Sequence, residues 1–558
     1  MKPKVAYFSM EIGIKQEMHT YSGGLGVLAG DTLKSAADLG MPVIGVSLLH
    51  EKGYFNQILN EHGEQREEED IWNKEEYLSY LNKDVYVKVH DRTVKVRGWL
   101  YELKGVNDNV LPIIFLDTNL EENSEFDRTL TSHLYGGDRY YRLCQEVILG
   151  IGGMKMLDAC GYNKLETYHM NEGHAALLTA ELLDKLRREN PGRNYDDYVQ
   201  LLRSRCVFTT HTPVPAGHDT FSHEEAIKVL GQYPNISLKF IELEDGLNMT
   251  HLALKNSKYV NAVARKHGQV SRDMFPGYDI KSITNGVHTY TWVNNHLKEV
   301  FNRNLIGWIE SPEILREALK INDEEIWNAH QACKKELINY VNERTGMNFN
   351  IDTFTIGFAR RATGYKRANL LLRDLERLKD ISVNKGGIQI IFGGKAHPND
   401  TQGKEYIKQI IERAKQIIGD VKCVYLDNYD MNLAKKLVSG VDLWLNTPLR
   451  PNEASGTSGM KAAHNGVPSL SVLDGWWIEG CVEGVTGWSI GESYQDGQNQ
   501  DEVDSASLYE KIEKNILPTY YQNRKEWLKI MKHCIAINGS YFNTHRMIKE
   551  YISKSYFR

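Results

Sequence analysis

TFTIGFARRATGYKRANLLLRDLERLKDISVNKGGIQIIFGG, residues 353–394, carries the pattern that decides the fold of this chain. A β-rich apolar run at 353–359 is followed by a polar turn, a helical pattern and a second apolar run at 387–394. The rhythm continues through apolar runs at 421–427, 441–447 and 467–473, with helical patterns between them. Strands that alternate with helices at this spacing indicate stacked βαβ units, so we predict a Rossmann-like domain with a parallel sheet.

The N-terminal half begins with another unit of this kind. An apolar run at 4–11 precedes a glycine-rich turn and a helical pattern at 21–40, and a further apolar run follows at 42–49. Between about 51 and 130 the apolar residues alternate by twos, which indicates antiparallel strands inserted into this domain. We therefore predict an α/β protein with two Rossmann-like domains that face each other across a cleft, with ligand sites at the carboxyl ends of the strands.

These patterns divide the 558 residues into three parts. Residues 1–290 should form the N-terminal domain with its β-rich insertion, and residues 291–535 the C-terminal domain, which would hold any cofactor. Residues 536–558 should be a helical segment that could pack back on the N-terminal domain. The charged stretch 294–350 reads as largely helical, and we expect it to link the domains.

Composition narrows the classes of function. The chain has 67 Lys+Arg and 73 Asp+Glu, a net charge of −6, which gives no electrostatic reason to expect nucleic acid or an anionic membrane as a partner. Its 7 cysteines include no C-x-x-C pair, so we expect a reducing compartment and neither a disulfide framework nor a cysteine zinc site. No stretch approaches the ~18 apolar residues of a membrane span. We expect a cytoplasmic protein without a bound metal.

Two loops have residues suited to anions. YSGGLG (21–26) places glycines before a helix, where free N–H groups and the helix dipole can hold an anion, although a ligand-free tight turn uses the same residues. RRATGYKR (360–367) has four cations directly after an apolar run. A solvated charged loop is the common alternative, but the position at the end of a strand favours phosphate binding.

The segment EASGTSGMK (453–461) is the most informative one. Small residues and hydroxyls precede a helix, and a carboxylate and a lysine flank them. A helix start with a buried, salt-bridged lysine is the alternative reading. An amine in an apolar setting is more easily deprotonated, and it can then form a Schiff base with a carbonyl cofactor.

Together these motifs resemble those of the α-glucan phosphorylases, the pyridoxal-phosphate-dependent family of glycogen, starch and maltodextrin phosphorylases. EASGTSGMK is similar to the family's cofactor-lysine motif, FARRATGYKR (358–367) to its phosphate-binding loop, YSGGLG to its glycine loop and ITNGVHTYTW (283–292) to its domain-junction segment. The resemblance implies a glycosyltransferase type B fold and retaining phosphorolysis of α-1,4-glucan from the non-reducing end, which releases α-D-glucose 1-phosphate. In that chemistry the 5'-phosphate of the cofactor is the acid/base partner of inorganic phosphate.

The resemblance also implies a role for each matching residue. Lys461 would hold pyridoxal 5'-phosphate, and Lys461, Arg361, Lys366 and His211 are the expected catalytic residues. Arg361 and Lys366 would bind the substrate phosphate, and His211 would act largely through its main-chain carbonyl. The cofactor would be contacted by Thr457, Ser458, Gly24, Arg360, Trp292 and Tyr429. The glucosyl unit would be surrounded by Glu453, Ser455, Gly456, Asn285, Gly23 and His211.

This chain departs from the family pattern at several positions. Asp430 stands where the animal enzymes have an arginine near the cofactor phosphate, so it should either point away or have a cationic neighbour. Ser458 replaces a glycine, Val27 an arginine and Ala362 a histidine. Glu172, His174 and Asp138 are further candidates for the cleft, with helix capping or a polar core role as the alternative for each.

Two other classes of function compete with phosphorolysis. A nucleotide-sugar-dependent glucosyltransferase such as a glycogen synthase has a similar glycine loop, but many such enzymes place a second glutamate after the first, and here Lys461 follows Glu453 by eight positions. A non-catalytic glucan-binding protein would be favoured by loss of Lys461 or Arg361, and both are present.

The resemblance also bears on regulation. The first strand starts at about Lys4, whereas in larger relatives the matching strand follows a long regulatory extension. The expectation is a short form that is constitutively active, insensitive to AMP and directed to soluble maltodextrins, with a homodimer as one possible assembly.

Overall fold

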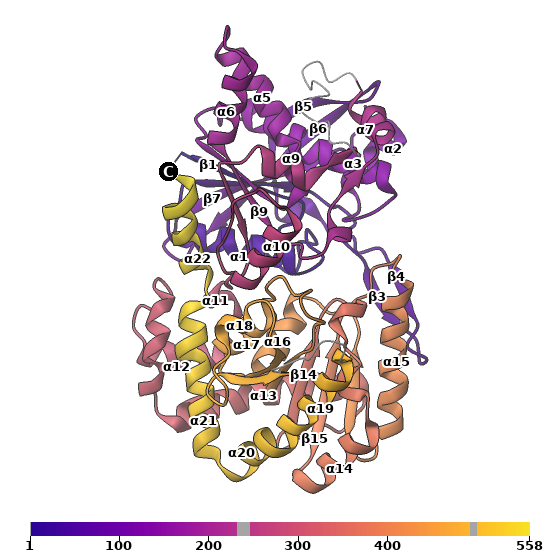
Figure 1. Ribbon diagram of the computed structural model, residues 1–558, viewed down its shortest axis with the longest axis vertical. Coiled ribbons are helices and arrows are strands. Elements are labelled where there is room, and N and C mark those ends of the chain that lie inside the picture. Colours follow the sequence, from indigo (N-terminus) through magenta and orange to yellow (C-terminus); the bar gives the residue numbers. More distant parts are fainter. Residues whose placement is uncertain (1, 232–245, 492–498, 558) are drawn as a thin grey trace. The chain divides into compact units, whose positions relative to one another are not determined.

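The computed structural model describes residues 2–231, 246–491 and 499–557, and the chain divides into two compact units (Figure 1). Unit 1 comprises Met1–Phe55, Glu69–Thr284 and Thr544–Arg558, and unit 2 comprises Asn56–Glu68 and Asn285–Asn543. The stretch 294–350, which we expected to link the domains, therefore lies wholly within unit 2. The chain returns to unit 1 after Asn543 and not after residue 535, because Cys534–Gly539 pack into the core of unit 2.

Unit 2 is built on a six-stranded parallel sheet in the order β16-β15-β14-β17-β18-β19. Counted along the chain, this is the order 3-2-1-4-5-6 of dinucleotide-binding folds, which reverses direction between its first and fourth strands. The predicted Rossmann-like domain is confirmed. The strands are β14 (Phe354–Ala359), β15 (Ile388–Gly393), β16 (Lys422–Leu426), β17 (Leu443–Asn446), β18 (Ser469–Val472) and β19 (Gly487–Ile490). The strand β19 was not predicted from the sequence, because only Trp488 and Ile490 among its four residues have apolar side chains.

Helices cover this sheet, and the buried apolar residues of both form one core. The helices of unit 2 are α11 (Thr289–Trp292), α12 (Asn295–Asn304), α13 (Asp323–Thr345), α14 (Leu375–Lys385), α15 (Thr401–Ile417), α16 (Met431–Gly440), α17 (Ser458–His464), α18 (Trp477–Gly480), α19 (Gln500–Lys511), α20 (Leu517–Gln522) and α21 (Arg524–His533). The hairpin of β3 (Asn56–Leu59) and β4 (Gln65–Glu68) also belongs to unit 2, where it lies alongside α15 (Figure 1).

Unit 1 has a nine-stranded sheet in the order β13-β12-β9-β8-β1-β2-β7-β6-β5. The strands from β13 to β7 run parallel, and β6 and β5 continue the sheet as an antiparallel hairpin. The antiparallel insertion that the sequence predicted is thus largely an extension of the main sheet. The strands are β1 (Val5–Ser9), β2 (Val43–Leu48), β5 (Ser79–Val89), β6 (Arg92–Lys104), β7 (Val110–Asp117), β8 (Thr167–Asn171), β9 (Cys206–Thr210), β12 (Tyr259–Ala262) and β13 (Ile280–Ser282).

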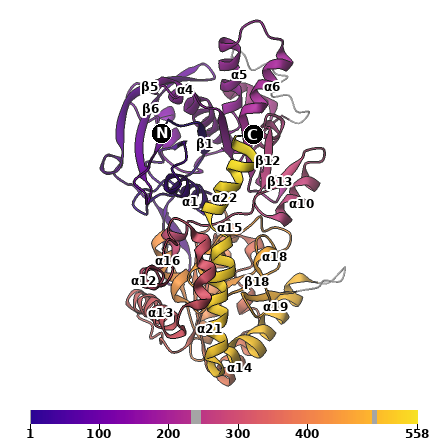
Figure 2. The same cartoon turned by 90° about the vertical axis from the view of Figure 1, so that its left-hand side faces the viewer.

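Helices pack on both faces of this sheet, over two cores of buried apolar residues. They are α1 (Gly24–Asp38), α2 (Glu125–Arg128), α3 (Arg139–Val147), α4 (Gly153–Ala159), α5 (Leu178–Glu189), α6 (Tyr195–Arg205), α7 (His223–Leu230), α9 (Met249–Lys255), α10 (Arg265–Met274) and α22 (Thr544–Tyr551). A short sheet of β10 (Thr220–Phe221) and β11 (Leu247–Asn248) completes the unit. The C-terminal α22 lies beside α1 (Figure 2). At this contact the Ser35 hydroxyl is 2.6 Å from that of Thr544.

All seven cysteines are free thiols. Within the described residues, no helix has both the length and the apolar character needed to cross a bilayer.

Candidate active site

The sheet of unit 2 reverses its strand order between β14 and β17, and an ion cluster lies at the carboxyl ends of these two strands. Arg360 directly follows β14 and donates to Asn446, the last residue of β17. Its guanidinium is 2.7 Å from the carboxylate of Glu453, and the Lys366 amine is also 2.7 Å from that carboxylate. The three side chains are at least nine-tenths buried. Ligands of open α/β sheets bind at such a reversal point, so the position fits a binding site.

Two buried cations control the charge of Glu453. Burial alone would raise the pKa of this carboxyl, but Arg360 and Lys366 lower it to about 2. The carboxylate is therefore ionised at neutral pH. It can accept hydrogen bonds from hydroxyl groups but cannot act as a proton donor there.

A neighbouring loop fixes the backbone of the Glu453 segment. The Asp474 carboxylate accepts the N–H groups of Glu453 and Gly475, each at 2.9 Å, and Trp476 donates its N–H to the Ser455 carbonyl at 3.0 Å. Burial raises the pKa of Asp474 to about 6. Gly456 has φ +75°, a backbone conformation that residues with a side chain rarely adopt, and it lies against Glu453. The sequence reasoning missed Asp474, although its place after an apolar run matches that of other candidate residues.

Lys461 lies in α17, where its side chain is buried and its Nζ is 3.7 Å from the ring centroid of Trp292. The carbonyl of Trp292 accepts the side-chain amide of Asn465 at 2.8 Å, which ties α11 to the end of α17. At the start of α17, the Thr457 side chain does not cap the helix. The Ser458 hydroxyl accepts the indole N–H of Trp444 at 3.1 Å and keeps its own proton for donation.

The four cations of the 360–367 loop have different surroundings. Arg367 is buried and donates to the Pro448 carbonyl and to Asp501, both at 2.9 Å, and also to Asp504, so it has a structural role. Arg360 and Lys366 reach Glu453, as described above. Arg361 is exposed.

Tyr429 and Asp430 follow β16. The Tyr429 ring lies against Gly393, the last residue of β15. Burial and the neighbouring Asp430 raise the pKa of Tyr429, so its phenol stays protonated. Asp430 accepts the Leu433 N–H at 2.7 Å as the N-cap of α16, and the charge of Arg344 acts on it. Asp430 thus caps a helix and has Arg344 as a cationic neighbour.

In unit 1, the ends of β8 and β9 bring Glu172 and His211 together. Glu172 accepts the His211 N–H at 2.8 Å and the Thr212 hydroxyl at 2.9 Å, and Asn171 lies 2.7 Å from Nε2 of His211. Glu172 has φ +73°, which is unusual for a residue with a side chain. Burial lowers the pKa of His211 to about 3, so its ring is neutral at pH 7. Asn285 is buried in the loop after β13, where unit 2 begins.

The glycine loop of unit 1 is held by Glu11, the second residue after β1. Its carboxylate accepts the N–H groups of Ser22 at 2.6 Å and Gly23 at 3.2 Å, and the Tyr135 hydroxyl at 2.7 Å. The Gly23 N–H therefore already has a protein acceptor, whereas Gly24 begins α1. The sequence reasoning missed Glu11 as well, although it ends the first apolar run.

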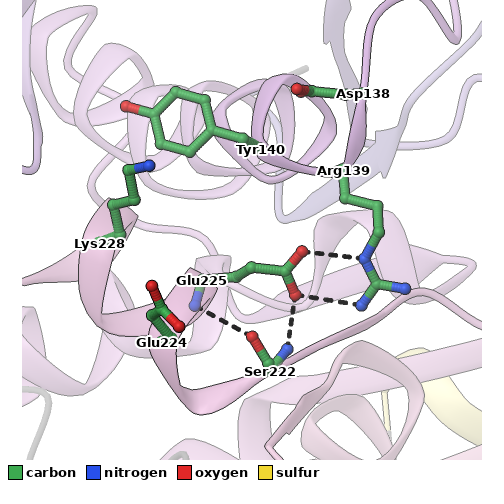
Figure 3. Close-up of a pocket in the computed structure, with 7 residues that line it drawn as sticks. All are labelled: Asp138, Arg139, Tyr140, Ser222, Glu224, Glu225 and Lys228. Carbon is green, nitrogen blue, oxygen red and sulfur yellow. Dashed lines mark hydrogen bonds and ion pairs between the residues drawn. The ribbon is translucent and has the colours of Figure 1, made fainter.

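A separate pocket of about 560 Å³ lies between α3 and α7 of unit 1 (Figure 3). Its charged groups largely satisfy one another: Arg139 pairs with Glu225 at 3.0 Å, Glu225 and Ser222 form a capping box, and the Lys228 amine is 5.3 Å from the Tyr140 ring centroid. Asp138 accepts the Tyr141 N–H as the N-cap of α3, so it has the capping role considered above. The pocket contains none of the residues that the resemblance assigns to catalysis or binding.

Comparison of the sequence with known proteins identifies the family of this chain. The sequence profile of the carbohydrate phosphorylases matches residues 11–103 and 220–505. The chain belongs to the carbohydrate phosphorylase family. It is 41% identical to the maltodextrin phosphorylase of Thermococcus litoralis, over 99% of this chain and 70% of that protein. It is 35% identical to the glycogen phosphorylase of Aquifex aeolicus, over 100% of this chain and 86% of that one. The glycogen phosphorylase of Mycobacterium tuberculosis is 34% identical, over 99% and 70%.

Membership of the phosphorylase family agrees with the largely parallel sheets of the two units, since two Rossmann-like units make up the type B glycosyltransferase fold. The Glu453 and Lys461 clusters lie inside the matched range, at 453–461. Glu172 and His211 lie between the two matched ranges.

Proposed function

We propose that this chain catalyses the phosphorolysis of α-1,4-glucan from the non-reducing end, releasing α-D-glucose 1-phosphate with retained configuration. The single observation that carries the proposal is the buried cluster at the strand reversal of unit 2, where Arg360 and Lys366 hold the Glu453 carboxylate. Two desolvated cations at such a point suit a reaction whose substrates include inorganic phosphate.

The residues around Lys461 fit pyridoxal 5'-phosphate. Its primary amine is buried and packs on an aromatic face, which suits covalent attachment of a flat, ring-shaped carbonyl cofactor. The hydroxyls of Thr457 and Ser458 are available as donors to a phosphate, and Arg360 supplies a forked cation. When bound, the cofactor would supply its 5'-phosphate as the acid/base partner of the substrate phosphate. Lys461 would hold it through Nζ.

The chain's own residues would bind and orient the two substrates. Arg361 and Lys366 would hold inorganic phosphate by charge-assisted hydrogen bonds. Glu453, ionised and fixed by the Asp474 loop, would accept hydrogen bonds from glucosyl hydroxyls, together with Ser455 and Gly456. His211 would present its main-chain carbonyl, because Glu172 fixes the backbone at this position.

The ionisation states support phosphate as the proton donor to the glycosidic oxygen. Glu453 has a pKa of about 2 and His211 a pKa of about 3, so neither carries a proton to donate at neutral pH. Inorganic phosphate carries exchangeable protons in that range. Clustered cations would then offset the repulsion between the anions that the reaction brings together.

The proposal is tested with purified protein supplied with pyridoxal 5'-phosphate, maltodextrin and inorganic phosphate. We expect a near-ultraviolet or visible absorbance band from the lysine-bound cofactor, and borohydride labelling of the peptide that contains Lys461. We also expect α-D-glucose 1-phosphate to form. Lys461→Ala should remove both the band and the activity.

Lys461→Arg is the matched control, because it keeps a cation near Trp292 but cannot form the covalent bond. It should also lose the band. A band that persists in either variant would contradict the assignment of Lys461. Protein that takes up no cofactor and transfers glucose only from a nucleotide sugar would instead support the synthase-type reading.

A further inference from the structure

The hairpin β3–β4 makes its buried polar contacts with loops of unit 2, although both of its flanks belong to unit 1. Gln57 on β3 is only 2% exposed. Its side-chain amide donates to the Gly394 carbonyl at 3.0 Å and to Gln65 at 2.8 Å, and its side-chain carbonyl accepts the Asn428 N–H at 2.9 Å. All hydrogen-bonding directions of this buried amide except one acceptor lone pair are thus used, which is typical of a structural link.

Gln65 on β4 makes the matching contact one step further along the same loop. Its side-chain carbonyl accepts the Ala396 N–H at 3.0 Å, and its amide donates to the Ala396 carbonyl at 2.9 Å. The two glutamines therefore hold both ends of the segment 394–396 that follows β15. Leu59 packs into a small apolar cluster with Ala396, and Glu67 pairs with Lys404 of α15 at 2.7 Å, so the hairpin is anchored at several points.

The segment that the glutamines hold is in direct contact with the arginine loop. The Gly393 carbonyl accepts the Arg360 N–H at 3.1 Å, and the Lys395 carbonyl accepts the Ala362 N–H at 3.0 Å. These two bonds fix the backbone on each side of Arg361. Gly394 has φ +140°, and a Cβ there would lie 1.8 Å from the Arg360 carbonyl oxygen, so the two backbones leave no room for adjustment.

The second target of Gln57 leads to Tyr429. Asn428 has φ +51°, an unfavourable conformation for a residue with a side chain, and its side-chain carbonyl accepts the Gln57 N–H at 3.2 Å. The reciprocal pair of bonds between Gln57 and Asn428 holds this conformation. These bonds fix the direction in which the chain leaves β16, and they thereby fix the position of Tyr429, the residue after Asn428.

We infer that Gln57 is a positioning residue for phosphate and cofactor binding, which acts by holding the loops that carry Arg360, Arg361 and Tyr429. The effect of Gln57 on catalysis rests on the proposed function. The ordering of the two loops by Gln57 does not depend on that function. Gln57 touches neither substrate nor cofactor in this account. Its contribution is the shape of two loops at the ends of β15 and β16, neither of which can form all of its hydrogen bonds without the hairpin.

The first test uses hydrogen–deuterium exchange on the protein without cofactor. The Asn428 amide is bonded to Gln57 itself and the Ala396 amide to Gln65, so peptides that contain them report the contacts directly. In Gln57→Ala we expect exchange in the peptides around 394–396 and 428–430 to rise by roughly fivefold or more, as loss of a typical hydrogen bond predicts. Gln57→Glu should affect the two loops differently, because a carboxylate still accepts the Asn428 N–H but cannot donate to the Gly394 carbonyl. Exchange should then rise around 394–396 and change less around 428–430.

The second test uses the enzyme loaded with pyridoxal 5'-phosphate. Gln57→Ala should lose cofactor severalfold faster on dialysis and raise the KM for phosphate, while the KM for maltodextrin stays within about twofold of the wild type. Glu68→Ala is the matched control, since this residue lies on the same hairpin and its side chain pairs with the exposed Arg66.

The outcomes separate this inference from the proposed function. Unchanged exchange at both loops in Gln57→Ala, or equal losses for phosphate and maltodextrin, would overturn the positioning role. The wild-type protein could also take up no cofactor and degrade no maltodextrin, while Gln57→Ala still shows faster exchange at the two loops. That result would establish the ordering of the loops by Gln57 and would contradict the proposed function instead.

Discussion

Replacing Glu453 by glutamine tests the charge balance of the candidate site. The variant keeps the size of the side chain but leaves Arg360 and Lys366 buried without their shared counter-ion. The folded-state pKa of Glu453 falls from an ordinary 4.5 to about 2. At about 1.4 kcal/mol per pKa unit, this depression corresponds to about 3 kcal/mol of stability at pH 7. Calorimetry should show a melting temperature lower by roughly 6–10 °C for the transition of unit 2.

The pH dependence of this effect has a definite sign. A carboxyl whose pKa is depressed by folding stabilises the protein fully above its unfolded pKa, and it loses that contribution as the pH falls towards its folded pKa. The difference between wild type and Glu453→Gln should therefore be constant from pH 7 to about pH 5 and shrink to roughly half at pH 3. Glu483→Gln is the control, because this glutamate of unit 2 lies outside the cluster and accepts hydrogen bonds from the Ser489 hydroxyl and the Lys511 amine.

Phosphate should compensate for the missing carboxylate. An anion that binds only the folded protein raises its stability, and two cations without a counter-ion should bind phosphate more tightly than the paired cations do. The melting temperature of Glu453→Gln should then rise more steeply with phosphate than that of the wild type. Equal melting temperatures without phosphate, or equal responses to phosphate, would refute the reasoning about this cluster.

Two further substitutions test the other anion and backbone contacts. Arg361→Ala should raise the KM for phosphate roughly tenfold or more, because a charge-assisted hydrogen bond contributes about 1.5–3 kcal/mol, and the KM for maltodextrin should change little. Initial-rate kinetics check this, with Arg373→Ala as the control. Equal losses for both substrates would contradict the prediction. Glu172→Gln should lower kcat by roughly fivefold or more with little change in either KM, because the two carboxylate oxygens accept the N–H groups of His211 and Gly173, and the NH2 group of a glutamine would face one of them as a second donor. Glu181→Gln, a buried glutamate of α5, is its control, and a kcat within twofold of wild type would count against the role of Glu172.

The local pattern of the sequence was sufficient to predict five of the six strands in the sheet of unit 2 and to single out the candidate residues at 453–461. Alternation of apolar runs with helical patterns is set by residues close together in the chain, and each of the five predicted runs contains a strand. The same holds for the 453–461 motif, where the carboxylate, the hydroxyls and the lysine are neighbours. Pattern also located the loop of cations, but it did not distinguish Arg367, which is structural, from Arg360 and Lys366, which meet Glu453.

The partners of these residues were decided only by the tertiary structure. Gln57 and Asn428 are 371 positions apart, and nothing in the composition of 51–130 indicated that the hairpin 56–68 would join unit 2. Asp474 and Glu453 come from loops after different strands, as do Glu172 and His211. Such pairs form because parallel strands bring their carboxyl ends to one edge of a sheet, in an order set by the packing of whole βαβ units. Local periodicity predicts the strands, but the order in which they pack determines which loops meet.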